Sequence, residues 1–123
     1  MRLLIVDDSN MIRSRISRVV QNGGLQHVSL VGLARNGAEA VRIARATQPE
    51  VVTMDLTMPE MDGIQCIGEL LRLFPKINIL VVSALSDKST AIAALKLGAR
   101  GFVAKPFSDD ELKMALLDVT ETR

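Results

Sequence analysis

Short apolar runs alternate with amphipathic stretches along this chain. The apolar runs predict strands at residues 2–7, 28–34, 51–54, 77–82 and 101–104. Apolar residues at three- and four-residue spacing predict a helix after each strand. Strands that are apolar throughout and alternate with helices indicate a parallel sheet that is covered on both faces. The fold class is therefore α/β, with five strand–helix units in one domain of 123 residues.

Capping residues and helix breakers give the expected helix ends. The first four helices are expected to close at or before Gly23-Gly24, Pro49, Pro75 and Gly98. The helices are expected to start at Ser9 or Asp8, at Asn36 or Gly37, after the loop 56–63, at Asp87 or Ser86, and at Ser108. The fourth helix is expected to carry the apolar residues Ala91, Ile92 and Leu95.

Four of the predicted strands end on polar residues. These are Asp7-Asp8, Asp55, Ser83 and Lys105, in the order of the strands. A common doubly wound order, 2-1-3-4-5, places strands 1 and 3 side by side and binds ligands outside the carboxyl ends. Neighbouring strands lie ~4.8 Å apart, so the carboxylates would face one another. Lys105 would start ~10 Å from Asp55, a gap that its long side chain can largely bridge.

These strand-end residues have the chemistry for phosphoryl transfer to an aspartate. Three close carboxylates repel one another, and a hard divalent cation such as Mg²⁺ removes that conflict in an all-oxygen site. A carboxylate is a competent nucleophile for phosphoryl transfer, and Asp55 is central in the sheet. Asp7 and Asp8 would hold the metal, while Ser83 and Lys105 would engage the phosphoryl oxygens. Each residue alone has an ordinary role as a cap, loop or surface residue, but the coincidence of all of them favours the functional interpretation.

The segments around these residues closely resemble the receiver domain of two-component response regulators, particularly the stand-alone chemotaxis type. The resemblance rests on residues 4–9, 52–63, 82–84 and 102–107. It implies a flavodoxin-like receiver fold over residues 1–123, without an output domain in this chain. It implies that a sensor histidine kinase phosphorylates Asp55, and that the chain catalyses its own phosphorylation and dephosphorylation without being an enzyme for another substrate.

The resemblance also assigns the ligands of the site. It implies that Mg²⁺ is bound by Asp7, Asp8, Asp55 and the backbone carbonyl of Thr57. It implies that the phosphoryl group is contacted by Ser83, the amide of Ala84 and Lys105, and that the Lys105-Pro106 peptide bond is cis.

A conformational switch and an output surface follow from the same resemblance. The switch residues would be Ser83 and Phe102, where Thr and Tyr are commoner in the family. The signal would leave through a downstream protein bound over the fourth helix, fifth strand and fifth helix. A phosphate sink or a phosphorelay intermediate, which passes the phosphoryl group to another histidine protein, is the alternative function.

Composition excludes several other classes of function. A formal net charge of +1 gives no electrostatic field that would attract nucleic acid or a membrane surface. Arg13, Arg15 and Arg18 are expected on a solvated helix face.

No apolar run approaches the ~20 residues of a membrane span, and a strand starting beside Met1 leaves no room for a signal peptide. The single cysteine, Cys66, excludes an intrachain disulfide and favours a cytoplasmic location. One His and one Cys cannot build a zinc site.

Three rival sites are weak. A phosphatase that uses an aspartyl phosphate would need a second acid two residues after Asp55, and Thr57 stands there. A flavin site would need a hydroxyl-rich loop and stacking aromatics, but the chain has no Trp or Tyr. The segment from Gly32 to Gly37 resembles a P-loop, but Ala38 and Glu39 replace its lysine and hydroxyl.

Overall fold

The computed structural model describes residues 1–120 apart from residues 26, 57, 59–61, 85 and 87. The described strands are β1 (Arg2–Val6), β2 (Ser29–Ala34), β3 (Val51–Met54), β4 (Asn78–Ala84) and β5 (Gly101–Lys105). The described helices are α1 (Asn10–Asn22), α2 (Gly37–Thr47), α3 (Gly63–Leu73), α4 (Lys88–Leu97) and α5 (Asp109–Thr120). None of these helices is long and apolar enough to cross a membrane.

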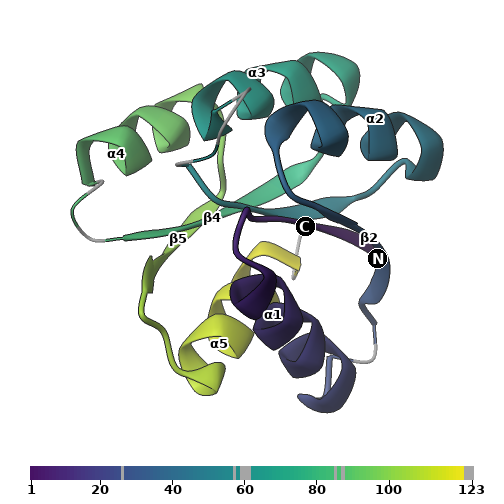
Figure 1. Cartoon of the computed structure of the whole chain (residues 1–123), viewed down its shortest axis with the longest axis vertical. Coiled ribbons are helices and arrows are strands. Elements are labelled where there is room, and N and C mark those ends of the chain that lie inside the picture. The colour runs from purple at the N-terminus through teal and green to yellow at the C-terminus, as the bar shows by residue number, and fades with distance from the viewer. Residues whose placement is uncertain (26, 57, 59–61, 85, 87, 121–123) are drawn as a thin grey trace.

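The five strands form one parallel sheet in the order β2-β1-β3-β4-β5. Helices α2, α3 and α4 cover one face of the sheet, and α1 and α5 cover the other (Figure 1). The predicted fold class and strand order are confirmed. Because the strands are parallel, their carboxyl ends meet at one edge, which brings the strand-end residues together.

Two hydrophobic cores lie on the two faces of the sheet, and residues of one strand alternate between them. Leu4 and Val6 belong to the core beneath α2, α3 and α4, whereas Leu3 and Ile5 belong to the core above α1 and α5. Cys66 is fully buried in the first of these cores, and burial raises the pKa of its thiol to about 12. The thiol therefore stays protonated, which suits a structural role.

Side-chain caps fix several helix ends and settle two of the open alternatives. The Ser9 hydroxyl accepts a hydrogen bond from the Ile12 amide at 3.2 Å, and Asn36 caps α2. Ser108 and Glu111 form a reciprocal capping box at the start of α5. The fourth helix has Asp87 as one candidate cap, and that residue lies outside the described residues.

Helix α4 packs on the sheet through its small residues. Ala91 and Ala94 are buried against the sheet, whereas Ile92 and Leu95 stay 45% and 42% exposed. All three apolar residues expected in the fourth helix lie on α4, but only Ala91 of them is buried. Small residues spaced by three positions let the helix approach the sheet, which turns the neighbouring larger side chains outward.

Candidate functional site

Asp7 and Asp55 lie at the carboxyl ends of the neighbouring strands β1 and β3. The Asp7 amide donates to the Ala34 carbonyl at 3.0 Å, and the Asp55 amide donates to the Val6 carbonyl at 2.9 Å. These bonds continue the sheet hydrogen bonding by one residue beyond β1 and β3. The backbones of both aspartates are therefore held by hydrogen bonds to neighbouring strands of the sheet.

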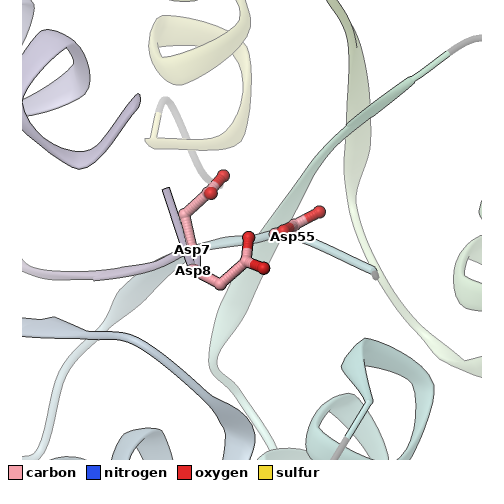
Figure 2. Close-up of side chains that lie close together, drawn as sticks. All are labelled: Asp7, Asp8 and Asp55. Carbon is pink, nitrogen blue, oxygen red and sulfur yellow. The ribbon is translucent and has the colours of Figure 1, made fainter. Parts of the chain in front are cut away.

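Three carboxylates converge at this edge, as the sequence predicts. Carboxylate oxygens of Asp7, Asp8 and Asp55 lie within 4.8 Å of one another. Figure 2 shows the Asp8 carboxylate turned toward Asp55. Asp7 and Asp55 are buried, at 1% and 4% exposure, whereas Asp8 is exposed. Three carboxylates with one side open to solvent are the donor set that Mg²⁺ prefers, because it binds oxygen and retains several waters.

Lys105 reaches this cluster from β5. Its ammonium nitrogen lies 2.9 Å from Oδ2 of Asp7 and 3.6 Å from Oδ1 of Asp55, both as ion pairs. Burial by itself would lower the pKa of Lys105, but the contact with Asp7 and the charge of Asp55 outweigh it and raise that pKa. The ammonium is therefore charged at neutral pH, and it partly neutralises the cluster.

Ser83 and Lys105 lie inside their strands rather than beyond them. β4 extends to Ala84 and β5 to Lys105, and the two strands pair Ser83 with Ala104 and Ala84 with Lys105. The predicted ends at residues 82 and 104 are therefore too early, because continued pairing between the two strands overrides the polar signal. Ser83 is buried near the carboxyl end of β4, on the strand next to the one that Asp55 follows.

The structure describes some, but not all, of the other residues that the resemblance names. The Lys105-Pro106 peptide bond is cis, as implied. Phe102 is partly buried and packs against the core beneath α2, α3 and α4. Thr57, whose carbonyl is the fourth implied metal ligand, lies outside the described residues.

Arg13 is a residue of the site region that the sequence interpretation missed. The prediction of a solvated face is wrong for Arg13, which is 9% exposed and donates to the Asp7 backbone carbonyl at 2.6 Å. A signal for this placement exists in the sequence, because Arg13 shares one helical stripe with Ile16 and Val20. Arg15 is partly buried over the Phe107 ring, and of the three arginines only Arg18 is exposed as expected.

Residues 3–117 match the family model of the response regulator receiver domain. The chain belongs to this family. Among its relatives is the chemotaxis protein CheY of Thermotoga maritima, 38% identical over 120 residues that cover 98% of each chain. The chemotaxis protein CheY of Bacillus subtilis is 38% identical over 115 residues, covering 94% of this chain and 93% of that protein. This receiver domain is thus of the CheY-like kind that serves two-component phosphorylation signalling.

Solved receiver structures agree with this assignment. The receiver domain of AraT, a response regulator from Geobacillus stearothermophilus, has a TM-score of 0.90 at 27% identity, over 98% of this chain and 92% of that one. The CheX-CheY-BeF3-Mg complex from Borrelia burgdorferi also gives a TM-score of 0.90 at 27% identity, over 99% of this chain and 90% of that one. The resemblance seen in the sequence is confirmed at the level of family and fold.

Proposed function

We propose that this receiver domain accepts a phosphoryl group on Asp55 from a phosphohistidine of a sensor histidine kinase. In this transfer the phosphorus–nitrogen bond of the donor breaks and a phosphorus–oxygen bond to an Asp55 carboxylate oxygen forms. The imidazole leaves with the electron pair of the broken bond and takes up a proton. The observation that carries the proposal is the convergence of three carboxylates with the ammonium of Lys105 at one sheet edge.

The carboxylate set fits a Mg²⁺ ion, and Asp7, Asp8 and Asp55 would hold it together with the Thr57 carbonyl. When bound, the ion supplies positive charge that neutralises the phosphoryl oxygens. The related Borrelia structure, described as a complex that contains BeF3 and Mg, supports this assignment. Asp55 is the nucleophile in this arrangement, because it alone of the three follows the central strand β3.

The protein's own groups would hold the transferred phosphoryl group. Ser83 and the amide of Ala84 lie at the end of β4, next to the strand that carries Asp55. Lys105 would move from its ion pairs with the aspartates to the phosphoryl oxygens. Charge-assisted bonds that exist only in the phosphorylated protein would then shift the population of Ser83 and Phe102 arrangements, which is the proposed switch.

The output partner is proposed to bind over α4, β5 and α5. An open groove of about 460 Å³ lies between β5 and α5 and is lined by Phe102, Val103, Asp110, Glu111, Met114, Ala115 and Asp118. Met114 of α5 is 60% exposed, and α4 exposes Ile92, Leu95 and Leu97. Exposed large apolar side chains on both helices beside one strand suit a protein partner.

Phosphorylation with a small phosphodonor and Mg²⁺, followed by intact-mass measurement, tests the acceptor. Wild type should gain one phosphoryl group, Asp55→Asn should gain none, and removal of Mg²⁺ by a chelator should prevent the gain. Asp118→Asn, which removes an exposed carboxylate on α5, is the matched control and should behave as wild type. Equal phosphorylation of Asp55→Asn and wild type would show that the acceptor lies elsewhere.

A further inference from the structure

Arg13 is a buried cation at an electrostatically unfavourable position. It lies in the second turn of α1, near the positive end of the helix dipole, where a cation is normally destabilising. The structure describes α1 throughout, and no acidic residue stands in its first turn to compensate. Burial of a charged group is strongly unfavourable unless that group is paired or hydrogen-bonded. The contacts of Arg13 therefore identify what keeps it there.

Arg13 contacts the backbone that joins Asp7 to Asp8, two of the three residues in the carboxylate cluster. Nη1 of Arg13 donates to the Asp7 carbonyl oxygen at 2.6 Å, a buried and charge-assisted hydrogen bond. Nη2 donates to Oδ1 of Asn10 at 3.2 Å, which fixes the guanidinium plane against the first turn. The Asp7 carbonyl belongs to the peptide plane that leads into Asp8, so this bond sets the orientation of that plane.

All three oxygens of Asp7 are held by different segments of the chain. The Ser9 amide donates to Oδ1 at 2.9 Å, Lys105 pairs with Oδ2, and Arg13 binds the backbone oxygen. Asp8 differs, because among the described residues its side chain has no hydrogen-bond or ion-pair partner. The direction of the Asp8 carboxylate, toward Asp55 in Figure 2, thus depends on the backbone that precedes it.

We propose that Arg13 is a positioning residue of the phosphoacceptor site: it orients the Asp7-Asp8 peptide so that the Asp8 carboxylate faces Asp55 and completes the cation site. The proposal rests on the proposed function, since it concerns the same metal ligands. It assigns Arg13 no contact with the metal or with the phosphoryl group.

The charge of Arg13 and its positioning role predict opposite effects on metal binding. A cation beside the carboxylates repels Mg²⁺, so by charge alone its removal should strengthen Mg²⁺ binding. If Arg13 orients the ligands, its removal should weaken binding, because groups that orient metal ligands typically contribute about tenfold or more to affinity. The sign of the change therefore separates the two roles.

The experiment measures Mg²⁺ affinity by calorimetry for wild type, Arg13→Gln, Arg13→Lys and Arg18→Gln. Arg18 lies on the same helix with the same charge but is exposed, which makes Arg18→Gln the matched control. Arg13→Gln should bind Mg²⁺ about tenfold or more weakly than Arg18→Gln. Arg13→Lys keeps the charge but lacks the two-pronged geometry, and it should also bind more weakly than wild type.

A second readout needs no metal. Amide hydrogen exchange by NMR in metal-free protein should show faster exchange at the Ser9 amide, which donates to Oδ1 of Asp7, in Arg13→Gln, with unchanged exchange in β3 and β4. Exchange that accelerates across the whole sheet, or loss of the fold in both Arg13 variants, would overturn the proposal in favour of a general structural role. Mg²⁺ binding by Arg13→Gln that equals or exceeds that of Arg18→Gln would also overturn it. Failure of wild type itself to bind Mg²⁺ would instead refute the proposed function.

Discussion

The Lys105 ammonium lies 2.9 Å from Oδ2 of Asp7, although β3 and β4 separate the strands that carry the two residues. The lysine side chain crosses the edge of the sheet and reaches Asp55 on the way, at 3.6 Å. Its charge thus occupies the region where a metal ion and a phosphoryl group would meet. Lys105 balances the charge of the carboxylates, and in the proposed mechanism it would change partners when the metal ion and the phosphoryl group bind.

Replacement of Lys105 by Met should strengthen Mg²⁺ binding. The substitution removes a positive charge from the carboxylate cluster while keeping most of the apolar stem. We expect affinity to rise by about tenfold, which is within reach of one charge removed a few ångströms away. Calorimetric titration measures it, with Lys76→Met as control, because Lys76 is exposed and lies beyond the far end of α3. Weaker binding by Lys105→Met would show that Lys105 supports the metal site rather than opposing it.

Phosphorylation should change the environment of Phe102 but not that of Phe74. The chain contains three Phe residues and no Trp or Tyr, so fluorinated phenylalanine gives a simple ¹⁹F NMR spectrum. The Phe102 resonance, assigned by its loss in Phe102→Leu, should shift when Asp55 is phosphorylated. Phe74 ends α3 near the opposite edge of the sheet and should not shift. Ser83→Ala and Lys105→Met should accept phosphate yet reduce the Phe102 shift, because each removes a side chain that is proposed to bind the phosphoryl group. A constant Phe102 signal at full phosphorylation would contradict the proposed switch.

Two glycines of α3 should respond to alanine in opposite ways. A Cβ at Gly63 would lie 2.5 Å from the Asp55 carbonyl oxygen and 2.5 Å from Cα of Leu56, both backbone atoms. Gly63→Ala should therefore cost about 1–3 kcal/mol in the free energy of unfolding, as overpacking does. It should also slow phosphorylation by about tenfold or more, because Asp55 would be displaced.

Gly68 is the matched control for that change. It lies in the exposed interior of the same helix, and a Cβ there meets nothing within 4 Å. Gly68→Ala should stabilise the protein by about 0.5–1 kcal/mol through helix propensity and leave phosphorylation unchanged. Urea unfolding and phosphorylation kinetics measure both variants. Equal stability of the two variants would show that a Cβ at Gly63 is accommodated without cost, against the close contacts with Asp55 and Leu56.

The sequence predicts the fold class and several helix caps correctly, but it does not predict where two of the strands end. Apolar strands between capped helices predict a parallel α/β sheet, and Ser9, Asn36 and Ser108 cap their helices as expected. The ends of β4 and β5 were predicted too early, because a polar residue such as Ser83 still pairs when its neighbour strand continues. Ladder pairing depends on a partner strand, which local composition does not describe.

The candidate site likewise contains residues that the sequence predicts and one residue that it does not. Asp7, Asp8, Asp55 and Lys105 are predicted from strand ends, since parallel strands bring their carboxyl ends to one edge. Arg13 was missed because an arginine in an amphipathic helix is normally exposed. The buried carbonyl that holds it belongs to a residue outside that helix. The helical spacing of Arg13 puts it on the same stripe as the buried Ile16 and Val20, whereas its charge favours exposure.

By itself, the sequence determined the strand–helix alternation and the chemical groups at the strand ends, because these depend on local periodicity and on residue identity. The tertiary structure decided how those groups are connected: that Lys105 pairs with Asp7 across two strands, that Arg13 is buried against the Asp7 carbonyl, and that α4 turns Ile92 and Leu95 outward. Each of these depends on partners from distant segments. The stability of a buried charge or an exposed apolar side chain is set by such partners, and no local pattern encodes them.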